Sequence, residues 1–132
     1  MEPSVGVVIS LHAAVSPSED PAKVLSAARN VLGDCTYDVE ERDGMVSLRS
    51  RELKCLQKIH DQLRDRHVRA AANRLLLRMR DGRRVTMLLN RQAATAGVVA
   101  LCTSATESPL GPIVVEIETE TPDRLIDWLT VY

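Results

Sequence analysis

Three segments of this chain carry an apolar side chain at every second position, and this period limits the folds that the chain can adopt. They are Val5–Leu11, Val85–Leu89 and Ile113–Thr119. A period of two buries one face of a strand and leaves the other accessible to water, which is typical of antiparallel sheets. The sequence therefore predicts a two-layer α+β fold, with a largely antiparallel sheet and helices packed on one face.

Helical spacing of apolar residues separates the predicted strands. One apolar helical face covers Val24–Leu32 and ends at Gly33, and a second runs from Ser50 to Arg66. A third helix follows Thr121-Pro122-Asp123, where Thr suits the N-cap and Pro suits the first helical position. The pattern predicts helices that each bury one face against the sheet.

Turn residues organise the rest of the chain. Asp43-Gly44 lies between the extended segments Thr36–Glu41 and Met45–Arg49 and predicts a hairpin. Asn90–Ala96 is expected to form a short helical or irregular link, and Val98–Cys102 a further strand. At 132 residues, one domain covering residues 1–132 is expected.

The segment that follows Arg74 fits two structures. A helix starting at Val68 could continue to Met79 and end at Asp81-Gly82. Alternatively, the helix could end near Arg74, and Leu75–Arg80 could pair with the next strand as a hairpin. The hairpin would explain why Leu77 falls opposite the apolar helical face, and the sequence leaves both open.

Basic residues are concentrated in the middle of the chain. Residues 49–91 contain 13 of the 17 Lys and Arg residues but only four acids, so this block carries a net charge of about +9. Because the whole chain carries −1, the block suggests a surface that binds a polyanion, most simply nucleic acid. The alternative is that these arginines only cover the wet faces of helices.

The aromatic content restricts how nucleic acid could be bound. The chain has no Phe, one Trp and two Tyr, and Trp128 lies in an apolar helical pattern that favours burial. Proteins that read single strands usually stack bases on aromatic rings. We therefore expect binding through arginine and phosphate, because the guanidinium forks onto phosphate oxygens.

Cysteines and histidines do not suggest a metal site. The three cysteines, Cys35, Cys55 and Cys102, are odd in number and far apart, so buried thiols are expected and a disulfide framework is not. His60 and His67 are seven residues apart and would share one helix face, while His12 should be exposed after the first strand. None of these spacings matches a zinc site.

Enzyme motifs are also absent. The sequence contains no Gly-rich phosphate loop and no GxSxG or GxGxxG motif. Glu116, Glu118 and Glu120 could hold a divalent ion, but such alternation is more often the wet face of a sheet. We expect a non-catalytic protein without a cofactor, and a cytoplasmic location, because no membrane span or secretory signal is found.

Several short segments resemble a known family. These are Asn90-Arg91-Gln92-Ala93-Ala94, Gly97-Val98-Val99, Ser108-Pro109-Leu110-Gly111-Pro112-Ile113, Leu125-Ile126-Asp127-Trp128-Leu129, Arg74-Leu75-Leu76-Leu77-Arg78 and Glu19-Asp20-Pro21. Together they resemble a small archaeal family labelled RNA-binding. That family is similar in fold to the large-subunit ribosomal protein that contacts 5S ribosomal RNA, which implies structured RNA as a partner and a homodimer.

The predicted RNA contacts are the arginines on either side of Asp81-Gly82, before the predicted strand Val85–Leu89, and the Asn-Arg-Gln segment. The candidate residues are Arg74, Arg78, Arg80, Arg83, Arg84, Asn90, Arg91 and Gln92. Structural roles compete with this hypothesis, because Asn90 could cap the link and Arg91 could pair with the Glu-rich strand. A second hypothesis is an assembly protein whose basic block meets an acidic surface of another copy.

Overall fold

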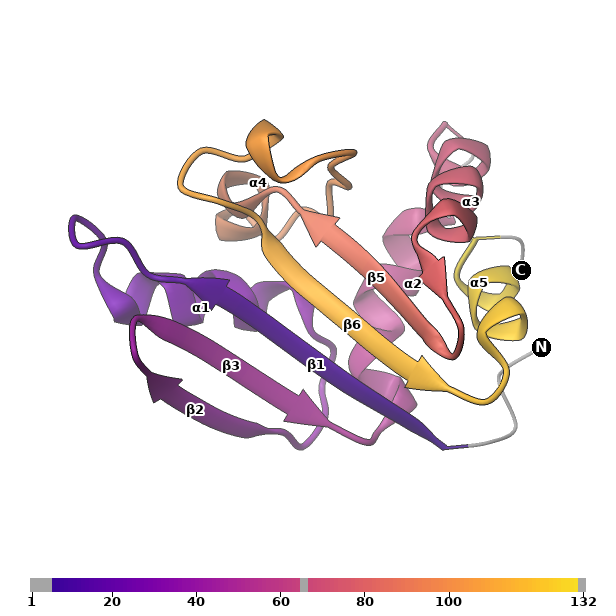
Figure 1. Cartoon of the computed structure of the whole chain (residues 1–132), viewed down its shortest axis with the longest axis horizontal. Helices are drawn as coiled ribbons and strands as arrows, with labels where there is room; N and C mark the ends of the chain where they lie inside the picture. The colour runs from indigo at the N-terminus through magenta and orange to yellow at the C-terminus, as the bar shows by residue number, and fades with distance from the viewer. Residues whose placement is uncertain (1–5, 65–66, 131–132) are drawn as a thin grey trace.

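A six-stranded antiparallel sheet forms one layer of the molecule, and helices pack on one of its faces (Figure 1). The computed structural model describes residues 6–64 and 67–130. The strand order is β2-β3-β1-β6-β5-β4. The predicted α+β class with a largely antiparallel sheet is confirmed.

The alternating segments supply the central strands. The strands are β1 (Val7–Ala14), β2 (Asp38–Arg42), β3 (Met45–Ser50), β4 (Arg80–Asp81), β5 (Arg84–Leu89) and β6 (Ile113–Thr119). In β6, Ile113, Val115 and Ile117 are fully buried, while Glu118 is exposed. This burial pattern follows the period of two and directs one face of the sheet towards the helices.

The predicted hairpin at Asp43-Gly44 is present and joins β2 to β3. Both turn residues have positive φ, 52° at Asp43 and 73° at Gly44. Two residues with positive φ form a type I′ turn, whose twist matches that of the strands. The turn thereby fixes the register in which Asp38 lies opposite Arg49.

Helices fill the second layer. They are α1 (Pro21–Val31), the 3₁₀ helix η1 (Leu53–Leu56), α2 (Gln57–Leu63), α3 (Arg69–Arg78), α4 (Arg91–Thr95), the 3₁₀ helix η2 (Ala105–Glu107) and α5 (Pro122–Thr130). Asp20 caps α1 by accepting a hydrogen bond from the Ala22 N–H at 3.0 Å. Thr121 precedes α5 as predicted, but its buried hydroxyl has no hydrogen-bond partner and therefore does not act as the expected cap.

Of the two structures considered for the segment after Arg74, the helix is the one observed. Helix α3 continues to Arg78, and Leu77 remains on its outer side with 47% of its surface exposed. The Asp-Gly signal is nevertheless real, because β4 pairs with the start of β5 across Gly82. The turn follows the helix, so the alternative in which Leu75–Arg80 forms a strand is wrong, and only Arg80 and Asp81 pair with β5.

Two other predicted elements differ from the structure. The helix expected over 50–66 begins as η1 at Leu53, and α2 ends at Leu63; residues 65 and 66 lie outside the described part. Val98–Cys102 forms no strand apart from one bridge, between Leu89 and Leu101. The reason is that the Val98 N–H bonds the Ala93 carbonyl and the Val99 N–H bonds the Gln62 side chain instead.

The core lies between the sheet and the helices, and Trp128 belongs to it as predicted. Trp128 is only 6% exposed and stacks on His60 with ring centroids 4.3 Å apart. Among the described helices, none is long and apolar enough to cross a membrane.

Candidate nucleic-acid interface

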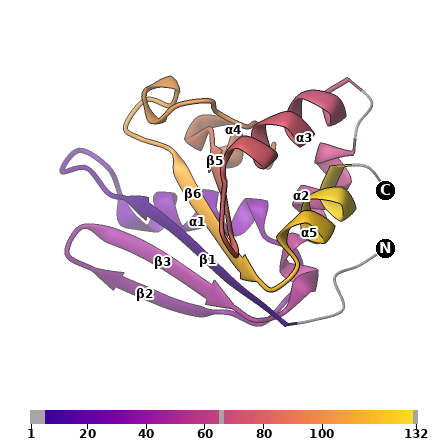
Figure 2. The ribbon, with the colours of Figure 1, turned by 45° about the vertical axis from the view of Figure 1, so that its right-hand side comes forward.

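Five of the predicted contact residues lie exposed along α3 and the β4–β5 hairpin. They are Arg74, Arg78, Arg80, Arg83 and Arg84. Helix α3 leads directly into the β4–β5 hairpin (Figure 2), so these five arginines lie on consecutive elements of the chain. The helix places the first two, and the Asp-Gly turn places the last two beside the end of β6.

These arginines differ in their partners. Arg80 lies 3.3 Å from a carboxylate oxygen of Asp123, and Arg84 lies 3.5 Å from one of Glu116. Both pairs are largely exposed, and exposed ion pairs contribute about 0–1 kcal/mol, so a phosphate could replace either carboxylate. In the described part of the chain, Arg74, Arg78 and Arg83 have no carboxylate partner.

The arginines do not gather in a single pocket. Arg74 and Arg78 line an apolar groove of about 630 Å³ between α3 and residues 98–101. Arg83 and Arg84 border a separate recess with Asp81 and Glu118. The surface therefore suits an extended ligand that follows α3 and the hairpin, and it does not suit one small molecule.

Asn90 has a structural role, as the competing interpretation proposed. Its Oδ1 accepts a hydrogen bond from the Ala93 N–H at 2.9 Å and so caps α4. Its own N–H donates to the Ala100 carbonyl at 2.8 Å. Gln92, in the first turn of α4, is exposed and lines the same pocket as Arg91.

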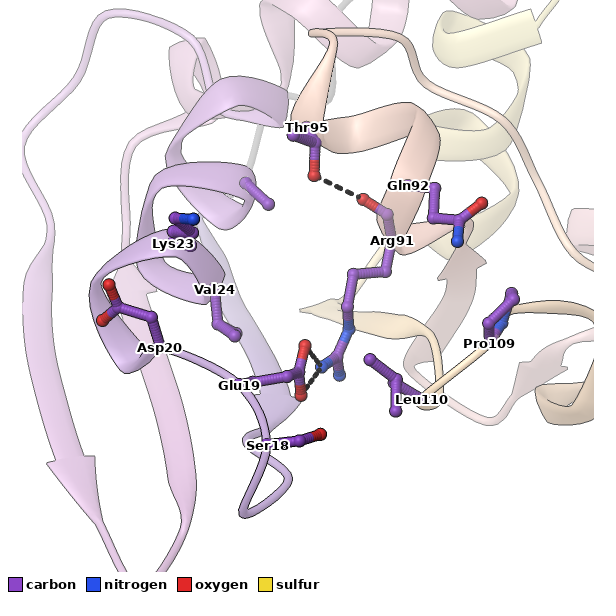
Figure 3. A pocket seen from close by; sticks show the side chains of 11 residues that line it. Ser18, Glu19, Asp20, Lys23, Val24, Arg91, Gln92, Thr95, Pro109 and Leu110 are labelled. Atoms are coloured by element: carbon purple, nitrogen blue, oxygen red, sulfur yellow. Dashed lines mark hydrogen bonds and ion pairs between the residues drawn. The ribbon is translucent and has the colours of Figure 1, made fainter.

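Arg91 is buried, in contrast to the other predicted arginines (Figure 3). Only 6% of its side chain is exposed, and its Nη1 donates to both oxygens of Glu19 at 2.7 and 2.8 Å. The expectation that Arg91 pairs with the Glu-rich strand is therefore wrong. Arg91 ties α4 to the segment that precedes α1, and its side chain is not presented on the surface.

Glu19 is the residue of this site that the sequence analysis did not identify. Burial opposes its ionisation, but hydrogen bonds from the Ser16 N–H and from Arg91, together with the Arg91 charge, lower the pKa of its carboxyl below the ordinary value. Its one signal in the sequence is its place beside the N-cap Asp20. That signal does not identify a partner 72 residues away.

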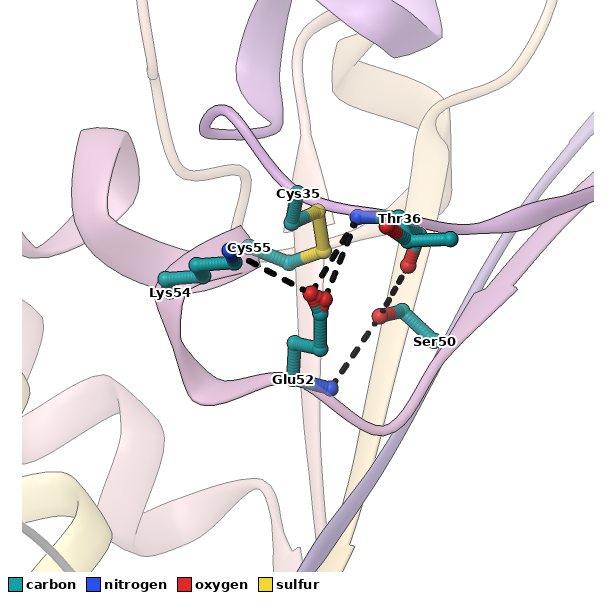
Figure 4. Close-up of a disulfide and its surroundings, with 6 residues drawn as sticks. All are labelled: Cys35, Thr36, Ser50, Glu52, Lys54 and Cys55. Carbon is teal, nitrogen blue, oxygen red and sulfur yellow. Dashed lines mark hydrogen bonds and ion pairs between the residues drawn. A yellow bond between two sulfur atoms is a disulfide. The ribbon is translucent and has the colours of Figure 1, made fainter.

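Cys35 and Cys55 are joined by a disulfide, so the expectation of buried thiols is wrong for this pair (Figure 4). They lie 20 residues apart in sequence, but their Cα atoms are 5.2 Å apart. The β2–β3 hairpin brings the segments before and after it together, and sequence spacing alone does not show this. Cys102 is a buried free thiol, and burial followed by the Glu107 charge raises its pKa.

Hydrogen bonds surround the disulfide. The Thr36 N–H donates to the carboxylate of Glu52 at 3.3 Å, and the Ser50 hydroxyl donates to the Thr36 carbonyl at 2.7 Å (Figure 4). Lys54 lies 3.5 Å from the same carboxylate. The segment from β3 to η1 is thus fixed to the segment before β2 by polar contacts as well as by the covalent bond.

The histidines do not lie as predicted. His12 is inside β1, where its Nε2 lies 3.1 Å from Glu116. His60 is buried in α2, while His67 lies in the turn after α2 ends, so the two do not share a helix face. The hydrogen bond between His60 and Asp61, followed by one from Gln57, lowers the pKa of Asp61. Nowhere in residues 6–64 and 67–130 do three His, Cys, Asp or Glu side chains gather as a metal site would require.

Comparison with known proteins places this chain in a family. A family model described as RNA binding matches residues 8–119. A UPF0201 protein of Sulfurisphaera tokodaii is 42% identical over 125 residues, which cover 92% of this chain and 86% of that protein. The chain belongs to the UPF0201 family. Another UPF0201 protein, from Sulfolobus acidocaldarius, is 39% identical over the same shares of both chains.

Solved structures of UPF0201 proteins share the fold. One crystal structure, 27% identical in sequence, superimposes with a TM-score of 0.78 and covers 95% of this chain and 94% of that one. The UPF0201 protein of Methanococcus jannaschii has a TM-score of 0.73 at 22% identity, covering 95% and 93%. The predicted resemblance to an RNA-binding family is confirmed at the level of the family.

Proposed function

We propose that this protein binds structured RNA without catalysing a reaction, through the exposed arginines of α3 and the β4–β5 hairpin. The observation that carries the proposal is the set Arg74, Arg78 and Arg83. All three are exposed and, in the described part of the chain, have no carboxylate partner. Exposed guanidinium groups without a carboxylate partner suit a phosphate backbone, because each can hold a phosphate with two parallel hydrogen bonds.

The family description supports RNA as the partner, since the matching model is described as RNA binding. Aromatic stacking does not contribute to our proposal. Trp128 is buried and Tyr37 packs partly against the core, so neither offers a free ring to a base. A double-stranded or folded RNA, recognised by shape and phosphate positions, suits such a surface better than an unstructured strand.

Binding to an RNA hairpin, the matching DNA duplex and a single strand, each across a salt series, tests this function. Phosphate contacts release counterions, so the logarithm of the association constant should fall linearly with the logarithm of the salt concentration. Preference for the RNA hairpin with a steep slope is the expected result. Equal weak binding to all three, or none at low salt, would overturn the proposal.

Self-association is a second candidate, favoured by the apolar groove beside α3. Val68 and Val98 line this groove and are 44% and 49% exposed. Apolar surface of this kind often marks an interface. Sedimentation velocity over a range of concentrations and salt would test the dimer. An interface built on the groove should persist at high salt, whereas contacts between basic and acidic surfaces should weaken.

Three further expectations stay predictions. They are the absence of catalysis, the cytoplasmic location, and the likeness to the ribosomal protein that contacts 5S RNA. Incubating labelled RNA with the protein and a divalent cation would test the first, and any cleavage lost in a Glu116→Gln, Glu118→Gln variant would contradict it.

A further inference from the structure

A pocket separate from the arginine surface lies between α1, α4 and the loop at Pro109–Leu110 (Figure 3). Its volume is about 320 Å³, which falls at the lower end of the range for small-molecule sites. Segments far apart in the sequence meet here: the residues before α1, the first turn of α4, and the loop before β6. The arginine on its wall, Arg91, is the one that the surface proposal does not use.

Arg91 has an unused hydrogen-bonding edge in this pocket. Its Nη1 holds Glu19, but its Nε and Nη2 are buried and have no hydrogen-bond partner. Leaving a buried donor unpaired costs about 1–3 kcal/mol for each group. The Nε and Nη2 N–H bonds point in parallel and form a fork that fits two adjacent acceptor atoms.

The charges around the pocket argue against a bare phosphate as its ligand. Among the lining residues, Lys23 and Arg91 are balanced by Glu19 and Asp20. A dianion would therefore gain little net attraction and would lie near two carboxylates. Val24, Ala27 and Leu110 supply apolar walls. A flat, uncharged group with two neighbouring acceptors suits this lining better.

The loop beside the unused edge is held in an unfavourable conformation. Leu110 has a φ of 67°, in the left-handed region that disfavours branched side chains, and 57% of its surface is exposed. Figure 3 shows Leu110 next to the Arg91 guanidinium, on the side away from Glu19. Because its side chain is mostly in water, little burial is lost if Leu110 moves away from the guanidinium.

We propose that this pocket binds an unstacked guanine base, with Arg91 Nε and Nη2 donating to O6 and N7. Guanine is the base that presents two adjacent acceptors on this edge, whereas adenine presents an acceptor and a donor. The inference rests on the proposed RNA binding: a guanine that leaves the stack of a bound RNA would enter the pocket while α3 and the hairpin hold the phosphates.

Titration of the ¹⁵N-labelled protein with guanosine 5′-monophosphate, adenosine 5′-monophosphate and inorganic phosphate tests the proposal. We expect the Arg91 Nε–H resonance to shift with the guanine nucleotide and not with the other two. An equal shift with phosphate alone would overturn the base assignment. Absence of any shift at millimolar guanine nucleotide would overturn the site itself.

Replacing Arg91 by Lys keeps the positive charge but removes the two parallel N–H donors of the guanidinium. Arg91→Lys retains a cation for Glu19 and should weaken guanine nucleotide binding about tenfold, the equivalent of one bidentate base contact. Arg42→Lys is the matched control, because it makes the same change at an exposed residue of β2, outside both the pocket and the proposed RNA surface, and should leave this affinity unchanged. If Arg91→Lys does not fold, the resonance measurement on the unsubstituted protein still decides.

The two proposals can fail separately. A protein that binds an RNA hairpin with a steep salt slope but shows no guanine shift would refute only the pocket. A protein that binds guanine nucleotide but no RNA would refute the arginine surface and leave a nucleotide site without its proposed context.

Discussion

Arg91 and the arginines of α3 and the β4–β5 hairpin have opposite environments in this molecule. In one half, α1, α4 and the β2–β3 hairpin are held together by the buried Arg91–Glu19 pair and the Cys35–Cys55 disulfide. In the other half, the arginines of α3 and the β4–β5 hairpin are exposed. Arg91 and Arg83 are eight positions apart in one basic block, yet one stabilises the fold and the other is available to a ligand.

The difference shows that a charge block does not define a surface by itself. The block is recognised by counting residues, but whether each guanidinium is buried depends on which segment packs over it. Arg91 begins a helix that packs against α1, while Arg83 occupies a turn. The comparison predicts that substitutions in the first half change stability and that those in the second half change ligand binding.

The largest expected effect is the loss of stability when Arg91 is replaced. Arg91→Ala removes the cation from the largely buried Glu19 carboxylate, which keeps only its hydrogen bond from the Ser16 N–H, and should lower the free energy of unfolding by about 3 kcal/mol. Arg83→Ala should change it by less than about 0.5 kcal/mol, as is usual for exposed sites. Urea denaturation of both variants measures the difference, and similar values for the two would contradict the comparison.

The disulfide should stabilise the same half. Cys35→Ser opens a loop of about 20 residues and should cost about 3 kcal/mol under oxidising conditions. Treating the parent protein with a reductant should reproduce this loss, because the same bond is broken. Alkylation of the unfolded, unreduced protein should modify one cysteine, Cys102; modification of three would show that the bond does not form.

A substitution at Gly33 tests how closely the residues around the disulfide are packed. A Cβ at this position would collide with the backbone carbonyl oxygen of Lys54, and the Gly33 N–H donates to the Cys55 carbonyl at 2.8 Å. Gly33→Ala should therefore lower stability by about 1–3 kcal/mol. Gly6→Ala is the control, since nothing lies within 4 Å of its added Cβ. Equal melting temperatures for the two variants would show that the contact is easily relieved.

Acid should weaken the Arg91–Glu19 pair. The pKa of Glu19 is lowered in the folded protein relative to its ordinary value of 4.5. Its contribution to stability is therefore complete above pH 4.5 and is lost as the pH falls through the folded-state pKa. The difference in unfolding free energy between the parent and Glu19→Gln should shrink over this range. A difference that stays constant down to pH 3 would mean that the carboxylate is not responsible.

Much of the sheet could be predicted from the sequence, because strands and turns depend on local patterns. The alternation in Ile113–Thr119 and the Asp43-Gly44 turn each fix an element without knowledge of distant residues. The Glu19–Arg91 pair and the disulfide could not be predicted, since each joins segments that only the complete fold brings together. The strand predicted over Val98–Cys102 was wrong for a related reason: the N–H groups of Val98 and Val99 bond Ala93 and Gln62, and only the end of the segment bonds to β5, through the Cys102 N–H and the Leu88 carbonyl.

Only part of the candidate interface could be predicted. The exposed arginines were found because charge in a turn or on the outer face of a helix is visible in the sequence. Arg91 and Asn90 were included for their position in the chain, but their side chains bind Glu19 and cap α4. Burial, which separates these two groups, is a property of packing between distant segments.

The most direct test of the central claim compares two triple variants in RNA binding. One variant changes Arg74, Arg78 and Arg83 to Gln and so removes three cations from α3 and the hairpin. The other variant changes Arg29, Arg42 and Arg49 to Gln and so removes three exposed cations from α1, β2 and β3. Both variants have the same net charge, so only the position of the lost charge differs. We expect the first variant to lose about two to three units from the slope of log affinity against log salt, one for each phosphate contact. The control should keep the parent's slope apart from a small general loss of attraction. Equal slopes in the two variants would contradict the account, because they would show that RNA responds to total charge and not to this surface.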